Sequence, residues 1–330
     1  MIPIFRRSCA LLVALLPLPA FAEPRVVARA AGGAAPLVVH AADDGLTVDV
    51  GGRRERVASP AGLRLEAAMR VGQGWLIAGA RPTASGSDLW LSRDGRELAP
   101  PAATARLRIN PQPLVAAGEL AGLAWLEGEG RRQLAVRFAP WHDGHFGAVT
   151  EVAPPGPGSQ LALSGTQLAD GRILLVWAGF DGEDDEIWAS WSSPSGWTSP
   201  VRVGGDNRVP DITPDLVADG SGALLAWSRF DGSEYQLVMA RFDGSQFTAP
   251  RALGEPGSVD ATFERHADGL AILYRDARRS SWALVELSAN AEPGRVSRWE
   301  ASAVERPVVQ WSARGPHWTL GARTAATAWD

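Results

Sequence analysis

The chain has 330 residues, of which 45% are hydrophobic, and a formal net charge of −5. It contains one cysteine, and all of its 32 basic residues are arginines. Lysine-based catalysis and P-loop nucleotide binding are therefore excluded, and an acidic chain without a basic run is a poor candidate for binding nucleic acid.

The N-terminal segment 1–22 predicts a secretory signal peptide. Arg6 and Arg7 precede an apolar run that ends in the small-x-small pattern of a cleavage site. The run is too short, and too interrupted by proline, for a membrane span. We expect cleavage before Glu23, a periplasmic or secreted location and no membrane span in the mature chain. Cleavage also removes Cys9, the one cysteine of the chain, so we expect neither disulfides nor thiolate chemistry in the mature protein.

From residue 62 onward the chain repeats a unit of about 50 residues. Each unit has a turn signal, a short apolar run with an aromatic residue, an alternating run, and a closing phrase. These patterns predict four short strands per unit and no sustained helix. The aromatic residues of five units stand 50, 52, 50 and 47 residues apart, and they are Trp75, Trp125, Trp177, Trp227 and Tyr274.

Four-stranded repeats of this length predict an all-β fold, a six-bladed β-propeller, with a β-sandwich as the alternative. Five units span 62–302, and a sixth begins at RPVVQWSARGPHWTLGAR. The chain ends before this unit is complete, and segment 35–50 offers the missing strands. We therefore expect residues 23–330 to form one domain, in which strands from both chain ends share the last blade and leave no sheet edge exposed.

Several phrases resemble the blades of sialidase-like propellers with BNR, or Asp-box, repeats. The first two strands of such a blade are similar to TPDLVADGSGALLAWSRFDG. The phrase that follows the Asp box is similar to GWTSPVRVG and to QFTAPRALG. The box itself, Ser-x-Asp-x-Gly-x-x-Trp, is present only as fragments. An active sialidase needs an arginine triad and a Tyr/Glu pair, and neither Tyr235 nor Tyr274 stands where that tyrosine is needed. The resemblance therefore implies a degenerate, non-catalytic propeller.

In a propeller, the loops between second and third strands and the crossovers between blades share one face, which we call the loop face. Arginines on these loops suit bidentate binding of a carboxylate or sulfate. The Asp-Gly turns on the opposite face are explained by turn geometry alone. The predicted ligand-binding residues of the loop face are Arg208, Asp211, Arg229, Asp231 and Arg275.

The loop FDGEDDE is the candidate metal site. Asp181, Asp184 and Asp185, with Glu186 next to them, offer the carboxylate oxygens that a hard cation such as Ca²⁺ prefers. Their spacing is not that of an EF-hand, and an acidic surface loop without an ion is the alternative. No other cofactor is expected.

No catalytic motif stands at diagnostic spacing. The sequence therefore favours an exported, non-catalytic binding protein whose partner is an envelope or extracellular protein or a glycan. The alternative is a diverged sialidase-like hydrolase or lyase, which would need two carboxyl groups roughly 5–9.5 Å apart at the channel mouth. A structural component of a larger envelope assembly is a third hypothesis.

Overall fold

The computed structural model describes residues 25–27, 37–42, 45–158, 160–266, 269–300, 306–312, 315–320 and 323–326. The ordered elements of these residues are β-strands, which confirms the all-β class. A helix of sufficient length and apolar character to cross a membrane is not found among them. The predicted signal peptide, residues 1–22, lies outside the described part of the chain.

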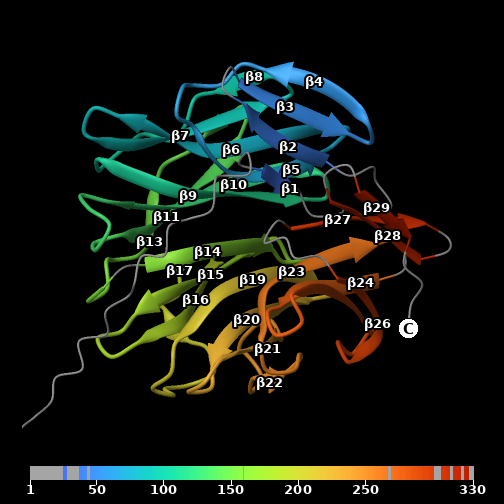
Figure 1. The fold of residues 1–330 in the computed structure, drawn as a ribbon. Helices are drawn as coiled ribbons and strands as arrows, with labels where there is room; N and C mark the ends of the chain where they lie inside the picture. The colour runs from blue at the N-terminus through green and yellow to red at the C-terminus, as the bar shows by residue number, and fades with distance from the viewer. Residues whose placement is uncertain are drawn as a thin grey trace, which may run out of the picture.

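The strands follow one another as antiparallel meanders, which we number units 1 to 7 in chain order (Figure 1). Units 2 and 3 are joined into one nine-stranded sheet by a parallel contact between Ser87 and Leu107. Units 1 and 2 contain β1 (Arg25–Val27), β2 (Leu37–Ala42), β3 (Gly45–Val50) and β4 (Arg53–Val57), then β5 (Arg64–Val71), β6 (Gly74–Thr83), β7 (Gly86–Arg93) and β8 (Arg96–Leu98). Unit 3 contains β9 (Leu107–Ala116), β10 (Glu119–Gly128), β11 (Ala135–His142), β12 (His145–Phe146) and β13 (Thr150–Ala153). Unit 4 contains β14 (Gln160–Gln167), β15 (Ile173–Phe180), β16 (Asp185–Ser193), β17 (Gly196–Trp197) and β18 (Val201–Arg202).

The remaining units complete the chain. Unit 5 contains β19 (Asp211–Asp219), β20 (Gly222–Phe230), β21 (Tyr235–Phe242) and β22 (Arg251–Ala252). Unit 6 contains β23 (Ser258–His266), β24 (Gly269–Asp276), β25 (Ser281–Leu287) and β26 (Pro293–Glu300). Unit 7 contains β27 (Val308–Ser312), β28 (Gly315–Leu320) and β29 (Arg323–Ala326).

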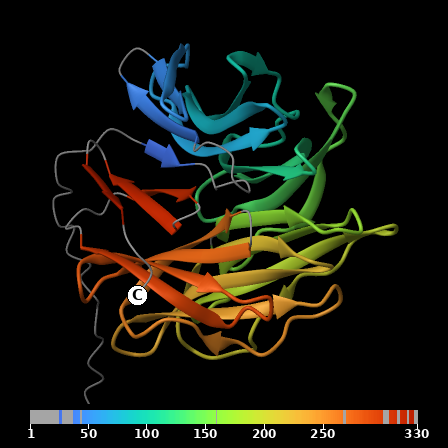
Figure 2. The same ribbon diagram turned by 90° about the vertical axis from the view of Figure 1, so that its right-hand side faces the viewer.

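The units are arranged around a common centre. Figure 2 shows them following one another in chain order, so that red unit 7 lies beside blue unit 1. The first strands of consecutive units contact one another, from β5 to β9, β14, β19 and β23. This radial arrangement of four-stranded meanders is that of a β-propeller.

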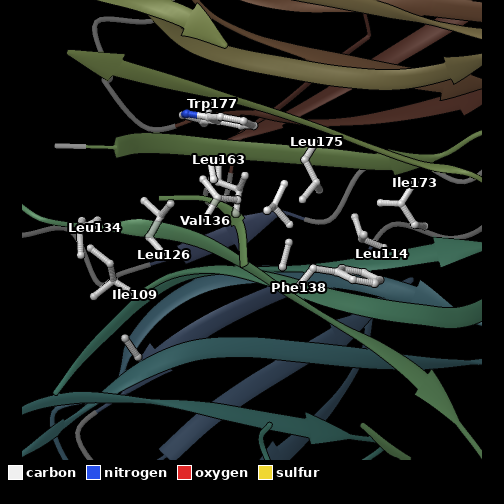
Figure 3. Close-up of a cluster of buried hydrophobic side chains, with 14 residues drawn as sticks. Ile109, Leu114, Leu126, Leu134, Val136, Phe138, Leu163, Ile173, Leu175 and Trp177 are labelled. Carbon is white, nitrogen blue, oxygen red and sulfur yellow. The ribbon is translucent and has the colours of Figure 1, made fainter. Parts of the chain in front are cut away.

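Apolar side chains fill the space between consecutive units. One cluster joins units 3 and 4, with Leu126 and Val136 on one side and Leu163, Leu175 and Trp177 on the other (Figure 3). Further clusters lie between units 1 and 2, 2 and 3, 4 and 5, 5 and 6, and 6 and 7. Because each inner sheet is covered on both faces, its second strand is a continuous apolar run rather than an alternating one.

The five sequence repeats correspond to units 2 to 6, but the chain ends differ from the expectation. Segment 35–50 supplies β2 and β3, which pair with β1 and β4 and not with unit 7. The described strands of unit 7 pair with one another. The shared last blade is therefore not formed by the described residues. The turn at Gly51 and Gly52 folds β4 back locally on β3, and the apolar side chains of this sheet pack on unit 2.

Trp75 also differs from its predicted equivalents. It stands beside the β5–β6 turn, and its indole N–H donates to Glu55 of β4 at 2.8 Å. Trp125, Trp177 and Trp227 instead stand toward the far ends of β10, β15 and β20. The 50-residue spacing from Trp75 to Trp125 therefore does not mark equivalent positions.

Candidate functional site

Units 3, 4 and 5 share one local arrangement at the loop face. A fully buried tryptophan occupies the second strand, and the residue two positions later lies directly opposite a residue of the first strand. We call these two opposite residues the loop-face pair. The pairs are Glu127 with Arg108 in unit 3, Gly179 with Gln160 in unit 4, and Arg229 with Asp211 in unit 5.

The pair of unit 3 is an enclosed ion pair. Arg108 Nε lies 3.2 Å from Glu127 Oε2, and its Nη1 lies 2.6 Å from Asp88 Oδ1. The indole of Trp125 donates to Glu127 at 3.0 Å. Both charged side chains are almost completely buried, at 1% and 0% exposure. Because each charge is compensated within the protein, this pair is explained by the architecture alone.

The pair of unit 5 brings together two of the predicted ligand-binding residues. Arg229 donates to both oxygens of Asp211, at 2.9 and 2.7 Å, and its guanidinium lies 5.6 Å from the ring centre of Trp227. The hydrogen bonds to Asp211 raise the pKa of Arg229 above its ordinary value. Asp211 is fully buried and Arg229 is 23% exposed, so each of the two charged groups has the other as its main interaction partner.

Glu186 of unit 4 adds a second buried carboxyl group beside this pair. The backbone N–H and the side-chain amide of Asn207 donate to Glu186 at 3.3 and 3.4 Å, and the same amide donates to Asp211 at 3.0 Å. Burial raises the pKa of Glu186 to about 7, and the charge of Asp211 acts in the same direction. Arg202, at 3.7 Å, opposes this shift only in part.

The carboxylates that come together as a candidate cation site are Asp181, Asp184 and Glu186, whose ligand oxygens lie within 4.8 Å of one another. Asp185 is outside this group, because it begins β16 opposite Phe180. Hydrogen bonds from the backbone of the loop, together with Arg202, lower the pKa of Asp181. Burial and the neighbouring carboxylates raise the pKa of Asp184. Binding of Ca²⁺ by this loop stays a prediction.

The other predicted ligand-binding residues do not converge on Asp211 and Arg229. Arg208 is 85% exposed and 4.0 Å from Glu183. Asp231 accepts hydrogen bonds from the backbone of its own loop. Arg275 forms an ion pair with Asp260 at 3.1 Å.

In unit 4 the loop-face pair carries no charge, and a pocket of about 250 Å³ opens beside it. A Cβ atom at Gly179 would clash with Gln160 Oε1, so the glycine leaves room for the Gln160 side chain, which lines the pocket. The pocket is lined by three aromatic residues, one ion pair, Gln160, a proline-rich crossover and the proline before β18. In this order they are Trp177, Phe180 and Trp188; Asp181 and Arg202; Gln160; Ala153, Pro154, Pro155, Gly156 and Pro157; and Pro200.

Two buried polar atoms of the pocket lining have no hydrogen-bond partner among the described residues. They are the indole Nε1 of Trp177, a donor, and Oε1 of Gln160, an acceptor; both atoms are enclosed by protein, and Nε1 of Trp227, the equivalent tryptophan of unit 5, also has no partner among the described residues. These side chains are 1% and 7% exposed. At the edge of the pocket Arg202 pairs with Asp181 at 2.9 Å and lies over the ring of Trp188 at 5.3 Å.

Sequence reasoning missed this pocket because it searched for charged residues. The available signal was a deviation within the repeat. Two residues after the core tryptophan, units 3 and 5 have Glu127 and Arg229, whereas unit 4 has Gly179. Buried polar groups without partners are uncommon in native proteins and call for an explanation.

Comparison with known proteins supports the fold. No model of a protein family matches the chain, and no curated protein matches it. A puromycin-hydrolyzing peptidase of Mycobacterium tuberculosis is similar over 90% of this chain and 48% of its own, at 17% identity and a TM-score of 0.56. This chain thus spans about half the length of that peptidase.

Two further solved structures match over most of their own length. One is a protein of unknown function from Dyadobacter fermentans, at 12% identity and a TM-score of 0.51, covering 83% of this chain and 85% of that one. The other is a subtype N10 neuraminidase-like protein of a virus from a little yellow-shouldered bat, at 9% identity and a TM-score of 0.50, covering 84% and 94%. At these low sequence identities the structural similarity shows a shared fold and does not show a shared function.

Proposed function

We propose that the protein is an exported, non-catalytic β-propeller binding protein that takes a glycan in the pocket beside Gln160 and Gly179. The observation that carries the proposal is the pocket itself, which opens where units 3 and 5 hold a charged pair and which three aromatic residues and Gln160 line. A hydroxyl group accepts one hydrogen bond and donates another. A sugar hydroxyl can therefore pair with either a donor or an acceptor of the pocket wall, whereas an ammonium group can only donate and a carbonyl can only accept.

The remaining walls suit the rest of a sugar ring. Phe180 and Trp188 present aromatic surface for the apolar C–H face of the sugar, and Asp181 and Arg202 place an acceptor and a donor at the edge of the pocket. The volume of about 250 Å³ is small for a binding site, which suits one residue of a glycan rather than a long segment.

The carboxylates of the loop face favour binding over hydrolysis. Asp211 is bound in bidentate fashion by Arg229, and Asp181 pairs with Arg202. Glu186, whose raised pKa suits a proton donor, has a side chain at 0% exposure. A glycoside hydrolase needs two carboxyl groups that reach the scissile bond from opposite sides. These three carboxyl groups are engaged or enclosed.

A glycan array tests the proposal. The mature protein should retain a subset of immobilised mono- and oligosaccharides, and Phe180→Ala should weaken this retention at least roughly tenfold, because it removes one aromatic wall. Leu161→Ala is the matched control, since Leu161 is another exposed apolar residue of unit 4 but does not line the pocket. Retention of no glycan, or retention that is equal in the wild type and Phe180→Ala, would contradict the proposal.

The same two variants test the second candidate, a protein partner. Leu161 and Phe180 are both exposed large hydrophobic residues of unit 4, at 42% and 37%. A protein that docks on this face would contact exposed apolar residues beyond the pocket. A purified envelope protein that binds the wild type, and loses affinity in both variants, would favour this candidate over a glycan.

Export is tested separately. Expression of the full chain with its N-terminus should yield a mature protein that begins at Glu23, measured by intact-mass spectrometry of the periplasmic or secreted fraction. A product that retains residues 1–22 and stays in the cytoplasmic fraction would contradict the export proposal and leave the pocket proposal unaffected.

A further inference from the structure

A second cavity, of about 600 Å³, lies at the other end of the first strands. The turns between first and second strands of units 3, 4 and 5 surround it, together with Arg265 of β23. We call this side the turn face. β19 connects the two faces, because Asp211 lies at its loop-face end and Ala218 lines this cavity. Ala218 stands seven positions after Asp211 in the strand, which places the two sites roughly 20 Å apart.

The walls of this cavity are made of small side chains and backbone. Ala116, Ala117, Ala169, Gly171, Ala218 and Gly220 are among the lining residues. Thr166 and Gln167 add a hydroxyl and an amide. Such walls leave the space open and bring polar groups within reach of a small ligand.

Among the described residues that line the cavity, Arg265 is the one that carries a charge. Its Nη2 donates to the backbone carbonyl of Ala218 at 2.6 Å. No carboxylate among the described residues forms an ion pair with it, although a guanidinium has five N–H donors. Two described carboxylates of the neighbouring turns form ion pairs elsewhere, since Asp219 pairs with Arg241 at 2.6 Å and Asp170 with Arg172 at 2.7 Å.

The repeat shows that the fold does not require an arginine here. Arg265 lies opposite Leu270, one step from the pair that closes the β23–β24 turn. The same register position is Ala218 in unit 5, opposite Ala223, and Val115 in unit 3, opposite Leu120. Those units form the same meander with a small or apolar residue, so the charge of Arg265 has no architectural role that they share.

We propose that the turn-face cavity is a second binding site, for a small ligand that carries a carboxylate, and that Arg265 is the residue that binds this carboxylate. A guanidinium pairs with a carboxylate through two parallel hydrogen bonds, and the other donors and acceptors of the cavity hold the remainder of the ligand. The loop-face pocket and its glycan are independent of this proposal.

Ligand-observed NMR tests it with the mature protein and glutarate, a flexible dicarboxylate, as the probe. Glutarate should show saturation transfer from the wild type, and glutaramide, its neutral analogue of similar shape, should show little. Arg265→Gln should weaken glutarate binding roughly tenfold or more, and Arg265→Lys should keep part of it. Ala169→Trp should also block binding, because the exposed Ala169 lines the cavity and a large ring there fills it.

Arg172→Gln is the matched control. Arg172 is an arginine of the same face that pairs with Asp170 and does not line the cavity, so this variant should bind glutarate like the wild type. Absence of glutarate binding to the wild type at millimolar concentration would overturn the proposal. Equal binding by the wild type and Arg265→Gln would also overturn it.

Discussion

Units 3 and 4 have the same backbone at the loop face but use it differently. Each has a fully buried tryptophan followed two residues later by the loop-face pair, in the same antiparallel register. In unit 3, Arg108 and Glu127 fill this position and compensate each other's charge. In unit 4, Gln160 and Gly179 carry no charge, and a pocket opens beside Gln160. In a repeat protein, a site is therefore best sought where one unit departs from its neighbours.

Unit 5 stands between these two cases. Its Asp211–Arg229 pair reverses the order of the charges of unit 3, with the acid on the first strand and the base on the second. Arg229 remains partly exposed to solvent. Glu186 from unit 4 lies beside the pair, and its contact with a cation is that with Arg202 at 3.7 Å. The four predictions below test this graded comparison, from the largest expected effect to the smallest.

Glu127→Ala should cause the largest loss of stability. It removes the enclosed carboxylate beside Arg108 and leaves this buried guanidinium with the partly exposed Asp88 alone, for which we expect a decrease of about 3 kcal/mol in the free energy of unfolding. Urea denaturation followed by tryptophan fluorescence measures it. The double variant Arg108→Met/Glu127→Leu is the control and should recover most of the loss. A decrease below about 1 kcal/mol in the single variant would show that the pair is not held as tightly as its burial indicates.

Asp211→Ala should destabilise the protein less, by about 2 kcal/mol, because the partly exposed guanidinium of Arg229 can turn toward water. The same urea titration compares it directly with Glu127→Ala. If the two losses were equal, the difference in solvent access between units 3 and 5 would have no energetic consequence.

Glu186→Gln should change the pH dependence of stability. The pKa of Glu186 is raised by burial to about 7 in the folded state, from an ordinary value of 4.5, so the folded state binds this proton more tightly than the unfolded chain. Stability of the wild type should therefore fall as pH rises from about 4.5 to about 7 and stay lower above that range. We expect the variant to match the wild type near the lower limit and to exceed it by about 1–2 kcal/mol above the upper limit.

Urea titrations of both proteins across this pH range measure the difference. Glu183→Gln, on the exposed part of the same loop, is the control and should not show the effect. A constant difference between wild type and Glu186→Gln at all pH values would contradict the raised pKa.

Gly179→Ala should have the smallest effect on stability, under about 1 kcal/mol, and a large effect on binding. The added Cβ meets Oε1 at the flexible end of Gln160, which can move, and a displaced Gln160 changes the wall of the pocket. We expect loss of glycan retention on the array with an almost unchanged urea midpoint. Gly130→Ala is the matched control, because a Cβ there meets nothing within 4 Å. Retention by Gly179→Ala at the level of this control would contradict the pocket assignment.

The repeat made the fold largely predictable. The five units between 62 and 302, their Asp-Gly turns and the buried aromatic residues at 125, 177 and 227 follow from local patterns, since strand alternation and turn chemistry are properties of neighbouring residues. The pairing of the chain ends was not predictable in this way. Segment 35–50 has strand character, but whether it joins unit 7 or forms unit 1 depends on what packs against it.

The candidate sites divide in the same way. The sequence alone determined that Asp211, Arg229 and the acidic loop 181–186 lie on one face, because the order of strands in each unit fixes where its loops emerge. Only the tertiary structure decided that Asp211 and Arg229 neutralise each other, that Glu186 rather than Asp185 joins Asp181 and Asp184, and that Gln160 and Gly179 leave a pocket. Strand register places residues that are distant in sequence directly opposite each other. Burial then determines whether their charged groups form an ion pair with each other or remain accessible to a ligand.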